Sequence, residues 1–431
     1  MKAFRLSLTL LFWMPLAAEA RLYVLIDQPS EHRFPIAIAD LIPEEGGKSR
    51  EWSEKVSQKI RDDLELTGLF ELIDPSSYPR TAEALSPNPA TIQFGPWSLI
   101  GAQALVHGSY ASESDGMRVS LHLYDPYLGQ HLVGRKYQAR EKEIPVVAHH
   151  FADEILKTLT GERGAFSTKI AFTCLAGKKK EICSMDMDGE NQRQLTHHKS
   201  ISLSPAWSPS GNEIAYSSYA GGGNPEIHIL STRGESRRIT ANETVNLSPV
   251  WSPQGFLTFS SALKGDTDIY LMDGGGKITR RLTESYGIDI NPSWSPDGRS
   301  IVFASERAGR LHLFRADATG SGVRRLTFVG YHNDNPAWSP RGDKIVFQGM
   351  DMGLWDLFIM NADGSMLQRL TASTGNNESP SWAPNGRFIT FSSDRHGSTQ
   401  IFIMREDGSN QTRLGPKKGG ATQPAWSPWF E

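Results

Sequence analysis

The stretch 291-NPSWSPDGRSIVFA-304 contains the pattern that decides the fold of this chain. Its core, Pro-x-Trp-(Ser/Ala)-Pro, occurs six times, with its tryptophans at Trp207, Trp251, Trp294, Trp338, Trp382 and Trp426. Successive tryptophans are separated by 44, 43, 44, 44 and 44 residues. A spacing this regular indicates an internal structural repeat and not an accident of composition.

Each repeat carries signals for four short strands. A Pro-x-Gly turn follows five of the tryptophans, and an alternating run such as Ile301-Val-Phe-Ala304 comes next. A second run such as Asp356-Leu-Phe-Ile-Met360 follows, and an Arg-x-(Leu/Ile)-Thr segment completes the unit. Four strands in about 44 residues are typical of a β-propeller blade, so six copies predict an all-β, six-bladed propeller over residues 166–431.

The phase of the repeat predicts how the ring closes. The array begins at Ile170-Ala-Phe-Thr173 without a tryptophan motif before it, and ends at Pro424-Ala-Trp-Ser-Pro428 without strands after it. One blade is therefore split between the two ends of the array. We predict that the C-terminal strand pairs with the first blade, around residues 170–196, because this pairing removes two exposed sheet edges.

The first 20 residues have the pattern of a cleaved secretory signal peptide. Lys2 and Arg5 precede an apolar run from Leu6 to Ala18, and Ala18-Glu19-Ala20 is a small-x-small cleavage site. The run is shorter than the ~20 residues that a membrane-spanning helix needs. We therefore expect an exported mature protein that begins at Arg21 and is not embedded in a membrane.

Residues 21–165 lack the repeat and are expected to form a mixed α/β domain. Apolar alternation predicts strands over 22–26, 35–39, 70–73, 104–110, 118–124 and 131–137. Helical periodicity predicts one helix around Trp52–Leu64 and another from Ile144 to Leu159, ending at Gly161. We expect the pair His149-His150 of the second helix on a solvated or half-buried surface.

Cys174 and Cys183 are the only cysteines, and they flank a predicted hairpin tip at residues 177–180. A loop centred between 178 and 179 would place them directly opposite each other, and an oxidising compartment would allow a disulfide between them. Two buried free thiols are the alternative. A metal site is not expected, since the two cysteines have no histidine pair nearby.

Charge and motifs exclude several functions. Lys+Arg 45 against Asp+Glu 48, with a net charge of −3, provides no positive field for nucleic acid. The chain contains no Gly-x-Ser-x-Gly elbow, no His-Glu-x-x-His and no Gly-rich phosphate loop. We predict no catalytic residue, no cofactor and no metal. The alternative is a propeller-type hydrolase or polysaccharide lyase acting in the channel.

Six polar segments, each between a Leu-Thr pair (Leu-Gly in the last copy) and the next Pro-x-Trp, are the candidate functional positions. Equivalent segments are expected to be loops that encircle one mouth of the channel, a rim suited to docking a partner. The alternative is that their side chains only cap backbone turns. The residues before the prolines are Ser204, Ser248, Asn291, Asn335, Ser379 and Gln423, and those three before the prolines are Ser202, Asn246, Asp289, Asn333, Asn377 and Ala421.

Several segments together resemble the TolB family over essentially the whole mature chain. They are 101-GAQALVHGSY-110, 149-HHFADEI-155 and 159-LTGERGAF-166, joined to the signal peptide and the six repeats. Tryptophan repeats of this kind occur in other propellers, but the combination with residues 159–166 is much more specific. The resemblance implies a non-enzymatic periplasmic adaptor of the Tol-Pal system that supports outer-membrane integrity and constriction during cell division.

The resemblance also implies two partners. The lipoprotein Pal would bind the propeller face that bears the polar segments, where Val245, Ile288 and His332 join the polar residues named above as candidates. The inner-membrane protein TolA would bind the mature N-terminal segment, which we expect to switch between docked and released states. That segment comprises Arg21, Leu22, Tyr23, Val24, Leu25, Ile26 and Asp27, and extends to Arg33. Other outer-membrane proteins are further candidate partners, and the free protein is expected to be a monomer.

Overall fold

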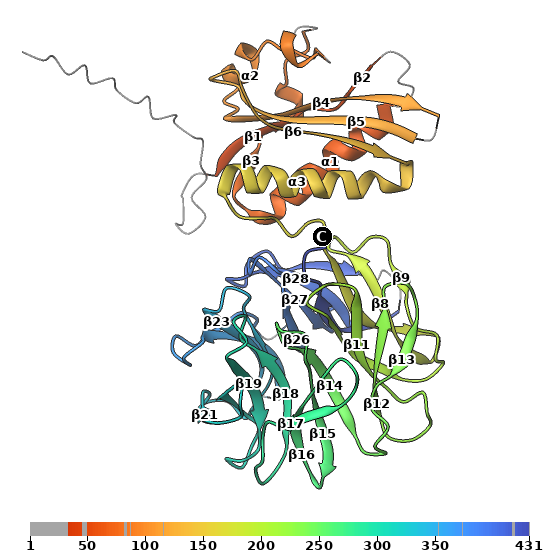
Figure 1. Ribbon diagram of the computed structural model, residues 1–431. Helices are drawn as coiled ribbons and strands as arrows, with labels where there is room; N and C mark the ends of the chain where they lie inside the picture. Colours follow the sequence, from red (N-terminus) through yellow and green to blue (C-terminus); the bar gives the residue numbers. More distant parts are fainter. Residues whose placement is uncertain are drawn as a thin grey trace, which may run out of the picture.

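The computed structural model describes residues 33–44, 50–81, 84–86, 88–114, 116–351, 353–372, 374–415 and 419–430. They form a mixed α/β unit that lies against one side of a ring of β-sheets (Figure 1). The predicted signal peptide and the predicted strand at 22–26 fall outside the described residues.

The N-terminal unit is built on one six-stranded mixed sheet. Its main path runs β3-β1-β4-β5-β6, with β2 beside β4. The strands are β1 (Phe34–Ile38), β2 (Ile42–Pro43), β3 (Phe70–Leu72), β4 (Ala104–Glu113), β5 (Gly116–Asp125) and β6 (Gln130–Ala139). The helices are α1 (Arg50–Thr67), the short α2 (Gly95–Leu99) and α3 (Ile144–Thr160), with single 3-10 turns at Pro75–Ser77, Pro89–Thr91 and Glu141–Glu143.

Helices α1 and α3 share one face of this sheet because their apolar residues recur at helical spacing. Ile60 of α1, Phe151 and Ile155 of α3, and Val106 of β4 are all fully buried in one cluster. Each such side chain contributes roughly 1.5–3 kcal/mol by leaving water. Helix α3 ends as predicted at Gly161, whose φ of 79° lets its N–H reach the carbonyl of Lys157.

The second unit is a ring of six four-stranded antiparallel sheets, as predicted (Figure 1). Within each sheet the strands are hydrogen-bonded in chain order, apart from the split blade described below. Five blades are continuous in the chain. The first consists of β10 (Ser202–Trp207), β11 (Glu213–Ser218), β12 (Glu226–Ser231) and β13 (Ser236–Arg238), and the second of β14 (Asn246–Trp251), β15 (Leu257–Lys264), β16 (Asp266–Met272) and β17 (Ile278–Arg281). The third consists of β18 (Asp289–Trp294), β19 (Ser300–Ser305), β20 (His312–Asp317) and β21 (Arg324–Arg325), and the fourth of β22 (His332–Trp338), β23 (Lys344–Asp351), β24 (Leu354–Asn361) and β25 (Gln368–Arg369). The fifth consists of β26 (Asn377–Trp382), β27 (Phe388–Ser393), β28 (Gln400–Arg405) and β29 (Thr412–Gly415).

The split blade confirms the predicted closure. Strand β30 (Ala421–Trp426) pairs with β7 (Lys169–Ala176), which continues into β8 (Lys179–Asp186) and β9 (Arg193–Gln194). Trp426 lies opposite Ile170 in this antiparallel pair. Its indole Nε1 also donates to Oγ1 of Thr168, at 2.7 Å, so the last strand is attached both to the first strand and to the chain that precedes it.

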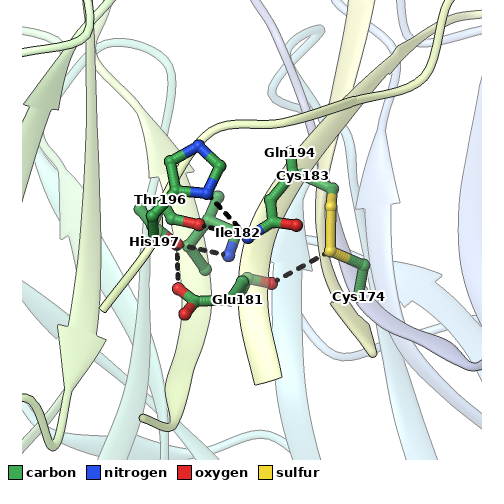
Figure 2. The surroundings of a disulfide bond; sticks show 7 residues. All are labelled: Cys174, Glu181, Ile182, Cys183, Gln194, Thr196 and His197. Atoms are coloured by element: carbon green, nitrogen blue, oxygen red, sulfur yellow. Dashed lines mark hydrogen bonds between the residues drawn. A yellow bond between two sulfur atoms is a disulfide. The ribbon is translucent and has the colours of Figure 1, made fainter. Parts of the chain in front are cut away.

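The two cysteines form a disulfide bond on the same hairpin, with a Cα–Cα distance of 5.8 Å (Figure 2). The expectation that they lie directly opposite each other is wrong. Cys174 pairs with Glu181, and Cys183 pairs with Phe172, so the bond runs diagonally. The reason is the turn, which is the two-residue Gly177-Lys178 with φ of 67° at Gly177, one residue earlier than predicted.

No helix among the described residues is both long enough and apolar enough to cross a membrane.

Deleting residues 421–431 should destabilise the whole propeller. The deletion exposes the edge of β7 and removes the buried Trp426 side chain, whose loss alone is expected to cost about 3–5 kcal/mol. Differential scanning calorimetry should show a markedly lower Tm, whereas removal of Glu431 alone should leave the Tm unchanged. Unaltered thermal unfolding of the longer deletion would contradict the role assigned to this pairing.

Candidate protein-docking site

The N-terminal unit covers the propeller face that carries one set of turns. It contacts Asp188 in the turn after β8, Arg387 at the start of β27, and Arg405 at the end of β28. These positions belong to the connections between first and second, or third and fourth, strands of a blade. Since the strands are antiparallel, the segments that join one blade to the next emerge on the opposite face. The predicted docking segments therefore lie on the face away from the N-terminal unit.

The residues three before each proline are not in loops. They begin the innermost strand of each blade, and their side chains are buried, with exposed fractions of 0–4%. The expectation that they form part of an accessible rim is wrong for Ser202, Asn246, Asp289, Asn333, Asn377 and Ala421.

Three of these six buried side chains, Asn246, Asn333 and Asn377, hydrogen-bond to the preceding blade. Nδ2 of Asn246 donates to Oε2 of Glu226 in the preceding blade, at 3.0 Å, and Glu226 also accepts from Thr240 of the Arg-x-Ile-Thr segment. Asn377 and Asp356 repeat the arrangement at 3.0 Å. A buried carboxylate needs hydrogen-bond donors to offset its desolvation, and the polar residue at the start of the next blade supplies one. The amide groups of Asn246 and Asn377 therefore serve the packing between blades.

The residues before the prolines occupy a β-bulge that recurs in all six blades. Ser204, Ser248, Asn291, Asn335, Ser379 and Gln423 all have positive φ, between 47° and 55°. The strand register shifts next to this position in every blade. Bulges re-aim side chains, and here they turn these six residues into the central channel.

The channel is a cavity of ≈ 540 Å³ lined mainly by the Pro-x-Trp motifs and by the six bulge residues. Several bulge residues are hydrogen-bonded across blades: Nε2 of Gln423 donates to Oγ of Ser204 at 3.1 Å, and Nδ2 of Asn291 donates to Asp334 at 2.8 Å. These side chains thus face the channel and its seams. The remaining candidates, Val245, Ile288 and His332, are half-buried beside the inter-blade segments.

The inter-blade segments also carry large apolar side chains that the sequence analysis did not single out. Tyr286 is 94% exposed, Phe328 is 72% exposed, and Tyr331 is 51% exposed, with Val329 between the latter two also exposed. All four follow the Leu-Thr pair of their blade, on the face away from the N-terminal unit. The sequence feature that could have identified them is a large apolar residue within a segment that was expected to be a polar loop.

Two arginines make cation–π contacts with the exposed aromatic rings. The guanidinium of Arg310 lies 4.0 Å from the ring centroid of Tyr331, and that of Arg325 lies 5.1 Å from the ring of Phe328. Tyr331 also stacks on His332 at 4.7 Å. Cation–π contacts pre-position exposed rings at low entropic cost. We call Phe328, Val329 and Tyr331, together with Tyr286 of the preceding inter-blade segment, the aromatic patch.

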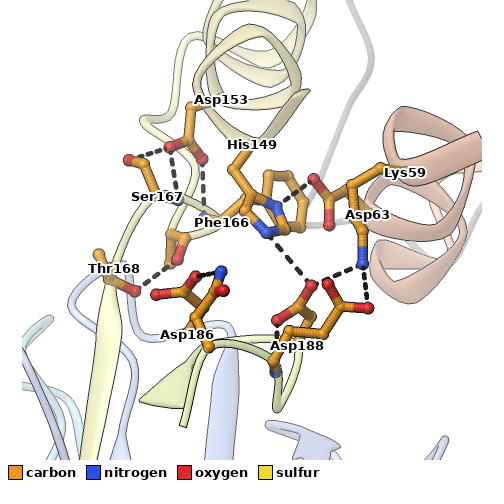
Figure 3. Close-up of polar contacts among 12 residues, drawn as sticks. Lys59, Asp63, His149, Asp153, Phe166, Ser167, Thr168, Asp186 and Asp188 are labelled. Atoms are coloured by element: carbon orange, nitrogen blue, oxygen red, sulfur yellow. Dashed lines mark hydrogen bonds and ion pairs between the residues drawn. The ribbon is translucent and has the colours of Figure 1, made fainter. Parts of the chain in front are cut away.

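A buried network of charges joins the two units (Figure 3). Nδ1 of His149 lies 2.7 Å from Oδ2 of Asp63, and its Nε2 lies 3.3 Å from Oδ2 of Asp188 in the propeller. Lys59 pairs with the same Asp188 oxygen at 2.7 Å. His149 is 2% exposed, so the expectation of a solvated or half-buried position is wrong for it. The reason is that α3 turns this side chain towards the propeller.

The connection between the units is also fixed. Asp153 of α3 accepts hydrogen bonds from the backbone N–H groups of Phe166 and Ser167, at 2.9 and 3.0 Å (Figure 3). Glu162 accepts two from the guanidinium of Arg387, at 2.7 and 2.9 Å. A bidentate pair of this kind sets orientation as well as distance.

The charges of this network depend on one another. Burial by itself lowers the pKa of His149, but the charge of Asp63 and the contact with Asp188 raise that pKa to about 10. Burial raises the pKa of Asp63 to about 6 in spite of the imidazolium beside it. Burial also acts against ionised Asp188, but His149 and Lys59 hold the pKa of this carboxyl below its usual value. At neutral pH the network therefore holds an imidazolium between two carboxylates.

Family models match both units of the chain. Residues 22–132 match the TolB amino-terminal domain, and residues 156–430 match the TolB beta propeller domain. The two matches follow each other along the chain and cover most of it.

Individual proteins to which the chain is similar are also named TolB. A protein TolB homolog of Chlorobium luteolum is 36% identical over 300 residues, which are 69% of this chain and 68% of the relative. A Tol-Pal system protein TolB of Syntrophotalea carbinolica is 36% identical over 198 residues, 46% of each chain. The crystal structure of TolB from Acinetobacter baumannii superposes with a TM-score of 0.79 at 27% identity, covering 93% of this chain and 98% of that one.

Replacing His149 with Gln should weaken the join between the units. The change leaves Asp63 and Asp188 without the cation between them, and breaking a buried ion pair is expected to cost about 3–5 kcal/mol. Denaturant unfolding measures this loss. Arg237→Gln is the control, because its pair with Glu213, at 3.2 Å, is partly exposed and should be worth less than about 1 kcal/mol.

The pH dependence of this contribution has a definite sign. The folded pKa of His149 lies above its ordinary 6.5, so its stabilisation is complete below about pH 6.5 and is lost as pH rises through about 10. The pKa of Asp188 is lowered, so its contribution is present above 3.8 and is lost as pH falls further. Equal pH profiles of wild type and His149→Gln above pH 6.5 would contradict this assignment.

Proposed function

The chain belongs to the TolB family, and we propose that it serves as a non-enzymatic adaptor of the Tol-Pal system in the periplasm. In this role it binds the lipoprotein Pal through the propeller and TolA through its N-terminal segment. By linking the two it supports outer-membrane integrity and constriction during cell division. The support for this proposal is the match of both family domains and the presence of an exposed aromatic surface suited to a protein partner.

The aromatic patch is the observation that carries the Pal assignment. Monomeric proteins seldom expose several large apolar side chains together unless they bind something. Tyrosine and arginine are enriched among residues that dominate binding energy, and this patch combines Tyr286 and Tyr331 with Arg310 and Arg325. It also lies on the face that the N-terminal unit leaves free.

The residues predicted from the repeat take different parts in this proposal. Val245, Ile288 and His332 lie beside the patch and are available for contact. The bulge residues reach a partner only where it enters the channel mouth. The buried residues at the strand starts act indirectly, because they hold the segments that present the patch.

An enzyme acting in the channel is the second candidate, and the channel lining argues against it. In the part of the chain that the structure describes, the lining consists of Pro, Trp, Ser, Ala, Val and amide side chains. General acid–base catalysis needs a group that exchanges protons near the working pH, and this set offers none.

Truncating the aromatic patch should reduce Pal binding. We expect the double variant Phe328→Ala/Tyr331→Ala to lose about 2 kcal/mol or more, roughly thirtyfold in Kd, as removal of central aromatic residues does at other interfaces. Isothermal titration calorimetry with purified Pal gives the value. Tyr127→Ala is the matched control, since Tyr127 is equally exposed but lies on the N-terminal unit. Unchanged affinity of the double variant would place Pal elsewhere.

The TolA assignment concerns residues 21–33, of which only Arg33 lies within the described residues. Arg33 is exposed, and its charge adds to the effect of burial in lowering the pKa of Arg405. Arg405 lines a cavity of ≈ 170 Å³ between the two units, together with Leu69, Leu156 and Phe388. Arg33, the last residue of the segment, therefore lies near a partly apolar cavity. This location supports a segment that alternates between docking here and binding a partner.

Removing residues 21–32 should abolish TolA binding, because the deletion takes away the proposed binding segment. Pal should still be bound, since the aromatic patch is on the far face. A pull-down of each purified partner measures both. Phe328→Ala/Tyr331→Ala provides the reciprocal control, with TolA bound and Pal weakened. TolA binding that survives the deletion would show that the segment is not its site.

A further inference from the structure

We propose that His122 and His131 form a binding site for a divalent transition-metal ion on the sheet of the N-terminal unit. His122 lies on β5 and His131 on β6, and Nδ1 of the first is 3.0 Å from Nε2 of the second. Their nine-residue separation is not a metal-binding spacing, so only the pairing of the strands brings the two rings together. Neither residue takes part in the surfaces proposed to bind Pal and TolA.

A β-bulge places both rings on the same face. Along β5 and β6, His122 pairs with Gly134 and Leu123 with Val133, but Tyr124 pairs with His131, so Leu132 is an extra residue. In a regular strand the side chains of residues 131 and 134 would point to opposite faces. The extra residue brings His131 onto the face of His122, which is the use that functional sites make of bulges. This face is the one that α1 and α3 leave uncovered, since Leu121 and Leu123 point towards the helices.

Gly134 leaves the space that the two rings occupy. A Cβ at this position would lie 2.5 Å from Nδ1 of His122 and 2.9 Å from Nε2 of His131. Glycine inside a strand weakens it and usually marks a position where another group approaches closely. Here the groups that approach are the two imidazole nitrogens themselves.

The distance between the nitrogens fits a shared ion. Two nitrogens that each lie about 2.0–2.1 Å from one metal ion are roughly 2.8–3.4 Å apart when the angle at the metal is between square-planar and tetrahedral. Two imidazoles without a carboxylate favour Zn²⁺, Cu²⁺ or Ni²⁺ over Mg²⁺ and Ca²⁺.

Water can complete the coordination of the proposed ion. His131 is exposed, so water molecules can fill the remaining coordination positions. The described residues contain no group of three or more His, Cys, Asp or Glu arranged to hold a metal. His107 pairs with His122 across β4 and β5, and its buried Nε2 has no hydrogen-bond partner in the described part of the chain.

Titration of the tag-free, full-length mature protein with Cu²⁺ tests the proposal. Cu²⁺ is the probe because it binds nitrogen sites most tightly among first-row divalent ions. Calorimetry should show a single site, electron paramagnetic resonance should show coordination by two imidazole nitrogens, and excess Zn²⁺ should compete. His131→Ala should weaken binding at least about tenfold, the scale on which metal sites respond to loss of a supporting residue.

Two further variants make the result decisive. His197→Ala is the matched control, since His197 is an exposed propeller histidine remote from the N-terminal sheet, and binding by this variant should equal that of wild type. Gly134→Ala should weaken binding by filling the space between the rings. Circular dichroism of His131→Ala checks that the fold is retained, which the exposure of this residue leads us to expect. Absence of Cu²⁺ binding by wild type, or equal binding by folded His131→Ala, would overturn the proposal and leave a simple hydrogen bond between the two rings.

Discussion

The pairing of β30 with β7 is the constraint on which the rest of the structure depends. The split blade has its four strands only when the last strand of the chain is hydrogen-bonded to β7, which would otherwise be an unpaired edge. The same strand is also tied to the connection between the units, since Trp426 bonds to Thr168 and the indole of Trp429 bonds to the carbonyl of Gly164. The C-terminal segment that closes the propeller therefore also contacts the connection to the N-terminal unit. The disulfide at Cys174 braces the hairpin that receives the strand.

The repeat uses its polar residues mainly for construction. Asn246 and Asn377 at the strand starts donate to buried carboxylates of the preceding blade, and Gln423 donates to Ser204, which joins β30 to β10 of the neighbouring blade. Positions that must recur in every blade are constrained by the geometry of the ring. The residues free to serve a partner are those that differ between blades, such as Tyr286 and Phe328. This explains why the aromatic patch covers only part of the face.

The join between the units combines charged pairs with apolar contacts, because the apolar cluster of the N-terminal unit continues through Phe166 to Phe172 of the split blade. An imidazolium at His149 lies between Asp63 of its own unit and Asp188 of the propeller, and Glu162 holds Arg387. Interfaces of this kind resemble those between separate proteins more than the interior of a domain. Such a join fixes one relative orientation, yet it can respond to changes in its charges. That property suits an adaptor in which binding events at two distant surfaces have to influence each other.

The sequence by itself determined the number of blades, their four-strand pattern, the split blade and the α/β character of residues 21–165. These features follow from periodicity, and periodicity is a local property of the chain that survives without knowledge of contacts. It also indicated that the inter-blade segments all emerge on one face of the ring. Only the tertiary structure decided which of their residues are accessible. Asn246 and Phe328 both belong to such segments, but one is buried by a carboxylate from another blade and the other is left in solvent. The pairing of His122 with His131 and of His149 with Asp188 likewise depends on strand register and domain packing, because residues far apart in sequence meet only when the whole fold is assembled.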